Sequence, residues 1–325
     1  MQKISVIGAG SWGTTLAVLL GEKGFDVALW SRREELANEV NNKRENKQYL
    51  PGIKISGNVI AEHSMKNALD KSELIIVAVP SEFFRTIIKQ IKTHFKNQII
   101  VSAAKGIEKG TSKRMSQVIE NELVKSNIAV LSGPNHAEEV SIKMPTASVV
   151  ASKDKKISKI VMDCLATKYF KMYEIDDVIG VEICGALKNI SAIATGVCDG
   201  LGFGDNTRAS IITLGLMEMN SFGRHFGAKR GTVYGLAGVG DLIATCTSRH
   251  SRNRFVGEQL AKNKSMEDIK KEMHGMVADG IPTTKAVYEY SSKHGIEMPL
   301  TKQAYEVIFN KKNLKHAMKD LLDIV

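Results

Sequence analysis

The sequence predicts an α/β protein in which an amino-terminal, doubly wound and mostly parallel sheet precedes an all-helical carboxyl-terminal domain. In the first half, continuous apolar runs such as LIIVAVP alternate with amphipathic segments. This alternation is typical of parallel strands that are buried on both faces and joined by helical, right-handed crossovers. After about Asp176, the β-branched runs give way to longer helical patterns. We therefore expect two domains, spanning residues 1–176 and 177–325.

Each predicted element is bounded by its apolar pattern. The strands are expected at Ile4–Ile7, Val27–Trp30, Leu74–Val79, Ile99–Ser102, Ala129–Leu131 and Ala147–Ala151. The helices of the first half are expected at Trp12–Gly21, Glu82–Ile91 and Thr111–Leu123. Those of the second half are expected at Asp177–Cys198, Ala209–Phe226, Arg252–Lys262, Glu267–Met273, Thr283–His294 and Leu300–Asn310. Ser265 is suited to cap one of these helices, and Gly295 to end another.

The charge balance is basic, with a formal net charge of +10, and this bears on the class of partner. Much of the excess lies in lysine-rich segments such as KDKKISK, Lys153–Lys159, which is typical of a solvated surface. Few aromatic residues and no nucleic-acid motif argue against a nucleic-acid partner. A basic excess can also indicate an anionic membrane or small anionic substrates, but a solvated surface explains most of it.

Cysteine usage and hydropathy predict a cytoplasmic protein without a metal site. The four cysteines form no C-x-x-C pair, so neither a disulfide framework nor a zinc site is indicated. Cys184 and Cys198 lie in an apolar stretch and are expected to be buried. The segment MQKISVIGAG enters a strand pattern directly, which does not resemble a signal peptide. No uninterrupted apolar run is long enough to span a bilayer, so we expect no stable membrane insertion.

The segment ISVIGAGSWG carries a G-x-G-x-x-G motif at Gly8, Gly10 and Gly13. It follows a predicted strand and opens a predicted helix, which is the context of a Rossmann dinucleotide site. The first glycine permits the tight turn, the second lets the pyrophosphate approach, and the third allows close packing of helix and strand. The phosphates would lie at the positive end of the helix. The alternative is a glycine-rich turn that binds no ligand.

The end of the second predicted strand bears on the choice between cofactors. NAD-selective enzymes usually place an acidic residue there to hold the ribose 2′-hydroxyl. This chain has Ser31, Arg32 and Arg33 instead, and guanidinium groups suit a 2′-phosphate. We therefore expect NADP(H) to be accepted alongside NAD(H). The alternative is that the arginines are surface residues neutralised by Glu34 and Glu35.

Two loops at strand ends are candidates for the substrate side, because ligands of open α/β sheets bind beyond the carboxyl ends of the strands. Lys105 follows the strand that ends at Ser102. The loop SGPNHAEE follows the next predicted strand and contains Gly133 and Asn135. Taken alone, Lys105 is equally well explained as a surface lysine.

A third candidate is the segment GLAGVGDLIATCTSRHSRNRF. It contains Asp241 and then Ser251, Arg252 and Asn253 at the start of a predicted helix. A hydroxyl, a guanidinium and an amide at a helix N-terminus suit the oxygens of a phosphate. The alternative is a simple N-cap by Ser251 with a solvated arginine beside it.

Lys188 stands alone in the apolar segment ICGALKNISAIATG. No other charged side chain lies between Glu182 and Asp199, and an unpartnered charge is unfavourable in an apolar setting. Small neighbours would let a ligand approach, and burial would lower the pKa of the lysine toward the working range. We hypothesise that Asp241 orients Lys188. The alternative is a surface lysine whose stem lies along the apolar face.

These motifs together resemble bacterial NAD(P)-dependent glycerol-3-phosphate dehydrogenases. GAGSWGT, SAAKGIE, SGPNHAEE, GALKNISAIATG, GDLIATCTSRHSRN and MVADGIPTTKAV occur in the order and spacing of that family over nearly the whole chain. The resemblance implies interconversion of dihydroxyacetone phosphate and sn-glycerol 3-phosphate, supply of glycerophospholipid synthesis, and a homodimer.

The resemblance also implies roles for individual residues. Lys188 matches the catalytic proton donor and acceptor. Cofactor contacts are implied, besides the glycine motif, for Ser11, Trp12, Arg32, Arg33, Lys105, Ala137, Arg252, Val277 and Asp279. Substrate contacts are implied for Lys105, Gly133, Asn135, Lys188, Asp241, Ser251, Arg252 and Asn253.

Two positions depart from the family pattern. Asn135 stands where the family usually has Ser or Thr, and Asp279 where it usually has Glu. Asn135 still carries hydrogen-bonding groups, whereas Asp279 is one methylene shorter than the usual glutamate.

Two other functions stay open on the residues alone. One is a similar dehydrogenase acting on a 2- or 3-hydroxy acid, and the other is a dinucleotide-binding sensor without catalysis, which would not need Lys188, Asp241 and Arg252 together.

Overall fold

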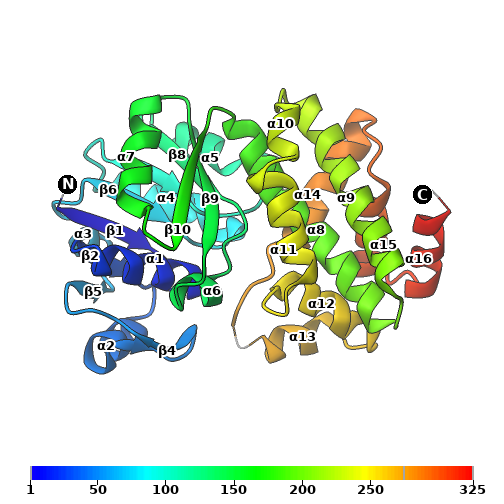
Figure 1. Ribbon diagram of the computed structural model, residues 1–325, viewed down its shortest axis with the longest axis horizontal. Helices are drawn as coiled ribbons and strands as arrows, with labels where there is room; N and C mark the ends of the chain where they lie inside the picture. The colour runs from blue at the N-terminus through cyan, green and yellow to red at the C-terminus, as the bar shows by residue number, and fades with distance from the viewer. Residues whose placement is uncertain (1, 274, 324–325) are drawn as a thin grey trace. The chain divides into compact units, whose positions relative to one another are not determined.

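The computed structural model describes residues 2–273 and 275–323. The chain divides into two compact units. Unit 1 comprises Met1–Ala104 and Met115–Val178, and unit 2 comprises Lys105–Arg114 and Ile179–Val325. Figure 1 identifies the elements of each unit by label and by colour along the chain.

Unit 1 is built on a sheet whose strands lie in the order β10-β9-β8-β7-β6-β1-β2-β5. Every neighbouring pair is parallel except β8 and β9, so the predicted doubly wound, mostly parallel sheet is confirmed. All six predicted strands are present, within a few residues of their predicted bounds. The strands are β1 (Lys3–Ile7), β2 (Asp26–Trp30), β5 (Val59–Glu62), β6 (Leu74–Val77), β7 (Ile99–Ser102), β8 (Asn127–Ser132), β9 (Thr146–Ser152) and β10 (Phe170–Ile175).

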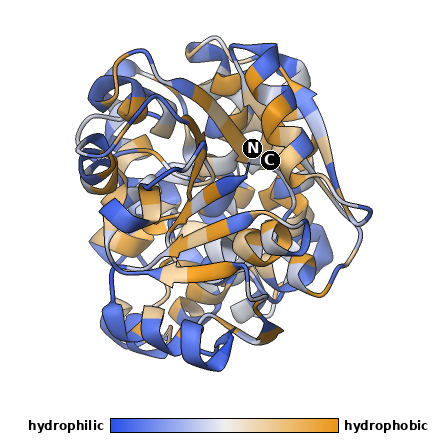
Figure 2. Cartoon of the chain, turned by 90° about the vertical axis from the view of Figure 1, so that its left-hand side faces the viewer, coloured by the Kyte–Doolittle hydropathy of each residue, from blue (hydrophilic) through white to orange (hydrophobic). Residues whose placement is uncertain are grey.

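Helices cover both faces of this sheet because successive side chains of a strand point to opposite faces. Leu74 and Ile76 of β6 belong to one apolar cluster, whereas Ile75 and Val77 belong to another. The first cluster includes residues of α1 (Ser11–Glu22), α2 (Glu34–Lys43) and α7 (Lys155–Leu165). The second includes residues of α3 (Met65–Leu69), α4 (Phe84–Lys92) and α5 (Met115–Glu122). In Figure 2 the strands are mainly orange, and hydrophilic residues lie on the outer surfaces of the helices.

The sequence reasoning missed the two edge strands β5 and β10. In both, buried residues alternate with more exposed ones, unlike the continuously buried central strands β6 and β7. It also missed helices α2, α3, α7 and α6 (Ala137–Ser141), and the short hairpin of β3 (Glu45–Asn46) and β4 (Leu50–Lys54).

The helix predicted at Thr111–Leu123 is wrong at its start. Helix α5 begins at Met115, and the preceding segment Lys105–Arg114 belongs to unit 2. Ile107 of this segment is buried in the apolar core of unit 2 and forms an isolated bridge with Arg114. Contacts of this segment with unit 2, namely the burial of Ile107 and the ion pair of Arg114 with Glu182, therefore override the helical pattern at residues 111–114.

Unit 2 is helical, apart from the bridge in Lys105–Arg114, and its central element is α8 (Val178–Gly200). Helix α8 is long and apolar enough to cross a membrane, although Glu182 and Lys188 interrupt its apolar run. The helix is buried nearly throughout, which is typical of the core helix of a soluble protein. The other helices are α9 (Asp205–His225), α10 (Arg230–Val233), α11 (Asp241–Thr247), α12 (Arg252–Ala261), α13 (Met266–Glu272), α14 (Gly280–His294), α15 (Pro299–Asn310) and α16 (Leu314–Leu322).

The helices predicted for unit 2 are confirmed, including the Ser265 cap on α13 and the left-handed Gly295 that ends α14. Helices α10, α11 and α16 were missed, as was the π-helical turn Leu236–Gly240 that precedes Asp241. Cys184 and Cys198 are buried as predicted, and so are Cys164 and Cys246.

Candidate active site

The glycine turn of unit 1 has the geometry that a dinucleotide requires. Gly8 adopts φ +115°, and an added Cβ would lie 2.5 Å from the carbonyl oxygen of Ala78. At Gly13 an added Cβ would lie 1.8 Å from the oxygen of Gly8, so helix and turn pack at backbone distance. Nothing lies within 4 Å of the Cβ position at Gly10. The turn is therefore open at Gly10, the residue expected to lie beside the pyrophosphate.

The start of α1 is left free for an anion. Gly10 is the N-cap and offers no side-chain hydrogen bond, and the first turn contains no acidic residue. Ser11 is buried there, and the Trp12 ring meets Phe170 edge-on at 6.2 Å between centroids. Exposed N–H groups at a helix start attract phosphate oxygens. These features fit the pyrophosphate of NAD(H) or NADP(H).

Asn46 supports this turn and was not predicted. Its fully buried amide donates hydrogen bonds to the carbonyl oxygen of Ala9, at 2.9 Å, and to Thr14 Oγ1, at 2.8 Å. Asn46 lies more than 30 positions from its partners, so local sequence gives no signal for the role.

Arg32 and Arg33 lie just beyond the end of β2, as predicted, and both are exposed. The Arg33 guanidinium donates to Gln48 Oε1 at 2.7 Å and to the Tyr49 hydroxyl at 3.2 Å. The Arg32 guanidinium lies 5.9 Å from the centre of the Phe83 ring. These partners are uncharged, so both arginines keep a positive charge that is available to a 2′-phosphate.

Gly133, Asn135 and Ala137 also belong to unit 1. Gly133 adopts φ +129° with Ser148 directly against it, which excludes a side chain at that position. The buried Asn135 amide donates to Ser148 Oγ at 2.9 Å. The Ala137 carbonyl, at the start of α6, accepts from Thr15 Oγ1 at 3.2 Å, which ties α6 to α1.

Unit 2 brings together Lys188, Asp241 and Lys105, which are far apart in the sequence. Lys188 Nζ donates to Asp241 Oδ1 at 2.5 Å and to Thr245 Oγ1 at 2.7 Å. Lys105 Nζ donates to the other carboxylate oxygen, Oδ2, at 2.8 Å. Lys188 is 5 % exposed and Asp241 is 2 % exposed, so the alternative of a surface lysine is wrong for Lys188.

The electrostatics of this lysine–aspartate cluster follow from its burial. Burial lowers the pKa of Lys188 to about 7, aided by the charge of Lys105 and opposed by that of Asp241. Burial also opposes ionisation of Asp241. The two ammonium groups outweigh that effect and hold the pKa of Asp241 below its ordinary value. The cluster therefore pairs a fixed carboxylate with a lysine that can exchange its proton near neutral pH.

Three contacts hold Lys105 in the cluster. Its segment is anchored to α8 by the ion pair of Arg114 and Glu182, at 2.5 Å. Ile107 is packed in the core of unit 2. The Asn189 amide, next to Lys188 on α8, donates to the carbonyl oxygen of Lys105 at 3.3 Å. Lys105 is thus a partner of Asp241. The sequence alone could not decide between a site residue and a surface lysine.

Thr245 is the member of the cluster that sequence reasoning missed. It lies four residues after Asp241, and this spacing places both side chains on one face of α11. Its hydroxyl accepts from Lys188 and donates to the Asp241 carbonyl oxygen at 2.6 Å. The i, i+4 relation to a predicted acidic residue was the available signal.

The start of α12 combines a cap with an exposed arginine. Ser251 Oγ accepts from Arg254 N at 3.2 Å, so the simple N-cap is present, and Arg252 beside it is exposed. The buried Asn253 amide donates to Asn189 Oδ1 at 2.9 Å and accepts from Gly280 N at 3.0 Å. The Asn253 side chain therefore ties α12 to α8 and to the start of α14.

The remaining predicted contacts, Val277 and Asp279, lie in the loop between α13 and α14, where both are half-buried. Asp279 is the N-cap residue of α14 by position, without a side-chain capping bond. Among residues 2–273 and 275–323, no group of three or more His, Cys, Asp and Glu side chains is placed to hold a metal ion.

Glu218 of α9 is another buried ionisable group in unit 2, at 5 % exposure, and it lies outside the lysine–aspartate cluster. Its Oε1 accepts from Leu300 N at 2.5 Å, and its Oε2 accepts from Thr301 Oγ1 at 2.6 Å. Thr301 N donates to both oxygens at 3.2 Å. Burial raises the pKa of Glu218 to about 7, and the hydrogen bonds from Thr301 and Leu300 oppose that rise.

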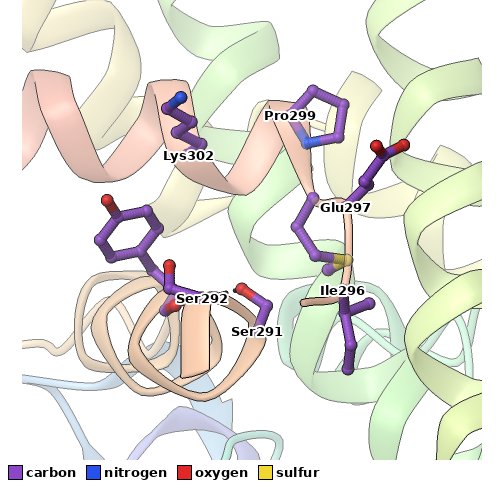
Figure 3. Close-up of a pocket in the computed structure, with 8 residues that line it drawn as sticks. Ser291, Ser292, Ile296, Glu297, Pro299 and Lys302 are labelled. Atoms are coloured by element: carbon purple, nitrogen blue, oxygen red, sulfur yellow. Dashed lines mark hydrogen bonds between the residues drawn. The ribbon is translucent and has the colours of Figure 1, made fainter. Parts of the chain in front are cut away.

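A pocket of about 380 Å³ lies where α14 ends and α15 begins. Figure 3 shows Ser291 and Ser292 on one side of it and Pro299 and Lys302 on the other. None of its lining residues is among the predicted site residues, so we do not assign the pocket to the site. The residues that line it are Tyr288, Ser291, Ser292, Ile296, Glu297, Met298, Pro299 and Lys302.

Comparison with known proteins adds independent evidence. Residues 3–158 match the family described as NAD-dependent glycerol-3-phosphate dehydrogenase N-terminus, and residues 177–319 match the corresponding C-terminus. The chain is 46% identical to glycerol-3-phosphate dehydrogenase [NAD(P)+] of Bacillus mycoides, over 99% of this chain and 96% of the relative. It is 47% identical to the enzyme of the same name from Chlorobium phaeobacteroides, over 99% of this chain and 97% of that one.

A solved structure agrees with these sequence matches. The crystal structure of glycerol-3-phosphate dehydrogenase from Coxiella burnetii superposes with a TM-score of 0.96 at 38% identity. The superposition covers 99% of both chains.

Proposed function

The chain belongs to the NAD-dependent glycerol-3-phosphate dehydrogenase family, and on that premise we propose that Lys188 exchanges the proton with the substrate oxygen. The chain is an oxidoreductase that reduces dihydroxyacetone phosphate to sn-glycerol 3-phosphate with NAD(P)H, in a reversible reaction. The observation that carries the role of Lys188 is its burial with Asp241, Thr245 and Lys105 in one hydrogen-bonded cluster.

The proposed proton transfer rests on the donors of Lys188. An ammonium group has three N–H donors. Two of them reach Asp241 and Thr245, and no third partner is found among the described residues. The third donor is thus available to the carbonyl oxygen of the substrate. As that oxygen gains negative charge, Lys188 stabilises it by hydrogen bonding and then protonates it.

Asp241 and Lys105 support this step. Asp241 accepts from both lysines, and therefore holds the Lys188 ammonium in a fixed direction. After the proton leaves, the neutral amine is tolerated because burial already favours the uncharged form. Thr245 still donates to a backbone carbonyl, so its own orientation does not depend on the charge of Lys188.

We propose that the cofactor is held by the glycine turn and the start of α1, with Arg32 and Arg33 near its ribose. When bound, the reduced dinucleotide supplies the hydride that converts the ketone to the alcohol. The open Cβ position at Gly10 and the uncapped start of α1 support this assignment. The two arginines support acceptance of NADPH as well as NADH. Ser11, Trp12, Lys105, Ala137, Arg252, Val277 and Asp279 stay proposed cofactor contacts.

We propose that the phosphate of the substrate is held by Lys105, Arg252 and the start of α12. The exposed guanidinium of Arg252 and the helix N-terminus support this role. The side chains of Ser251 and Asn253 make hydrogen bonds within the protein, so we assign them to shaping this site. Gly133 and Asn135 stay proposed substrate contacts, and the Asn135 amide already donates to Ser148.

Several finer assignments complete the proposal. We propose a cytoplasmic homodimer that supplies glycerophospholipid synthesis, with the domain boundary between residues 176 and 177. Exposed apolar side chains support self-association through unit 2. They are Met217 of α9, Tyr234 at the C-cap of α10 and Ile243 of α11. The spans of the two family matches support the boundary.

The function is tested by following the absorbance of the reduced nicotinamide with purified protein. We expect oxidation of NADPH, and also of NADH, that depends on dihydroxyacetone phosphate. A panel of 2- and 3-oxo acids should give much slower oxidation. Faster turnover of an oxo acid would favour the hydroxy-acid dehydrogenase. Cofactor binding without any turnover would favour the sensor.

A further inference from the structure

Helix α12 packs against α8 at backbone distance. An added Cβ at Gly196 would lie 2.0 Å from the carbonyl oxygen of Arg254. One at Gly257 would lie 2.0 Å from the carbonyl oxygen of Ile193. The two helices therefore meet through their backbones near the second turn of α12. Helix α8 carries Lys188 about two turns before this contact, a distance of about 12 Å along its axis.

The glycine contacts let the two backbones approach closely, and polar side chains add specific ties between the helices. The Asn253–Asn189 hydrogen bond is one such tie, and Asp199, near the end of α8, supplies another. Its Oδ2 accepts from Arg254 Nε of α12 at 2.7 Å. Its Oδ1 accepts from Arg208 of α9, from Nε at 2.8 Å and from Nη2 at 2.6 Å. The Asp199 side chain is only 9% exposed, so solvent screens these ion pairs weakly.

Arg254 connects this ion pair to the start of α12. Its backbone N–H donates to Ser251 Oγ and so closes the N-cap, while its side chain is held by Asp199 and by Glu258 at 2.8 Å. The exposed Arg252 lies two residues before it. Together with the Asn253–Asn189 hydrogen bond, the position of Arg254 along α8 therefore sets where Arg252 and the first N–H groups of α12 lie relative to Lys188.

We propose that Asp199 is a positioning residue which, through Arg254, sets the phosphate-binding start of α12 at the correct distance from Lys188. The inference rests on the proposed function, because it takes the start of α12 as the phosphate site. A three-carbon substrate must present its carbonyl to Lys188 and its phosphate to α12 at the same time. A displacement of about 1 Å between two such groups can lower the rate about 100-fold.

The test compares Asp199→Asn with Asp205→Asn as a matched control. Asp205 is also a carboxylate partner of Arg208, at 2.5 Å, but it is 92% exposed and does not contact Arg254. The Michaelis constant KM and kcat are measured with NADPH for dihydroxyacetone phosphate and for dihydroxyacetone, which lacks the phosphate. Arg254→Gln removes the other member of the ion pair and serves as a second variant.

We expect Asp199→Asn to raise KM for dihydroxyacetone phosphate about tenfold, with kcat/KM for dihydroxyacetone unchanged. Arg254→Gln should give the same pattern, and Asp205→Asn should match the wild type. Asp199→Glu, which keeps the charge, should recover part of the loss.

Two results would overturn the inference alone, with wild-type turnover of dihydroxyacetone phosphate intact. One is an unchanged KM in both Asp199→Asn and Arg254→Gln. The other is an equal loss of kcat/KM for the two ketones, which is the result of a merely structural role. Absence of dihydroxyacetone phosphate reduction by the wild type would instead overturn the proposed function itself, and the inference with it.

Discussion

Among the buried ionisable side chains of unit 2, Lys188 and Glu218 have the same exposure and nearly the same pKa but differ in their partners. Each is 5% exposed, and the pKa of each is shifted by burial to about 7. Lys188 is surrounded by side chains, namely a carboxylate and a hydroxyl. Glu218 is surrounded by the first N–H groups of α15 and by the Thr301 hydroxyl.

This difference shows that a shifted pKa does not by itself identify a catalytic residue. The partners of Glu218 are helix-start donors that would otherwise be unsatisfied, so its carboxylate stabilises α15 from within the protein. Lys188 keeps a donor available to a ligand and is held by Asp241, a residue whose own charge is fixed. We therefore assign Lys188 to the reaction and Glu218 to the fold.

The largest expected effect comes from Lys188→Met. Removing the proton donor should lower kcat for dihydroxyacetone phosphate reduction about 1,000-fold. Asp241 keeps Lys105 as a partner, so the fold and NADPH binding should persist. Steady-state kinetics and a thermal melt check this, with Glu218→Gln as the control that stays active. Turnover within tenfold of the wild type would remove Lys188 from the mechanism.

Glu218→Ala should lower stability and leave kcat unchanged, which is the opposite of the result expected for Lys188→Met. Losing the acceptor for Leu300 N, Thr301 N and the Thr301 hydroxyl leaves buried donors unsatisfied, so the free energy of unfolding should fall by about 3 kcal/mol. Catalysis by the folded fraction should be unchanged. Urea unfolding followed by fluorescence measures the first quantity, and kcat per active site measures the second. A large loss of kcat with unchanged stability would place Glu218 in the active site.

The pH dependence of stability sharpens the contrast further. Folding raises the pKa of Glu218 above its ordinary value. The stability that Glu218 contributes to the folded state is therefore complete below pH 4.5 and is lost as the pH rises toward about 7. Each pKa unit corresponds to about 1.4 kcal/mol. In the wild type, the free energy of unfolding should therefore fall by about 3 kcal/mol over that pH range. Glu218→Gln should abolish this fall, because glutamine does not ionise. Equal slopes in variant and wild type, measured by urea unfolding, would contradict the assignment.

Thr245→Val should give the smallest effect. The substitution removes one acceptor from the Lys188 ammonium, and a hydrogen bond to the charged form favours that form. The pKa of Lys188 should therefore fall further, and kcat should drop about tenfold near neutral pH. A pH–rate profile checks both. An unchanged profile would show that Thr245 does not orient the lysine.

The sequence reasoning identified Lys188 and Asp241 because each is unusual in its own segment. Lys188 interrupts an apolar helix, and Asp241 follows a glycine-rich turn. Thr245 was missed because helix α11 was not predicted, so its i, i+4 relation to Asp241 was not recognised. Glu218 escaped because Leu300 and Thr301 lie more than 80 positions along the chain, and a helical glutamate is ordinarily exposed.

The prediction of the fold had the same limits as the prediction of the site. Central strands such as β6 were predicted from continuous apolar runs, whereas the edge strands β5 and β10 lack that signal. Residues 111–114, at the end of the segment Lys105–Arg114, were expected to begin a helix of the first domain. Burial of Ile107 and the ion pair of Arg114 with Glu182 attach it to unit 2, and neither contact is visible in local sequence.

The most direct test of the central claim is the pH profile of kcat/KM in both directions of the reaction. Reduction of dihydroxyacetone phosphate requires protonated Lys188, so its kcat/KM should fall as the pH rises through about 7. Oxidation of sn-glycerol 3-phosphate requires neutral Lys188, so its kcat/KM should rise over the same range. Profiles that mirror each other, and that vanish in Lys188→Met, are the predicted result. The same pH-dependent step persisting in Lys188→Met would contradict the account.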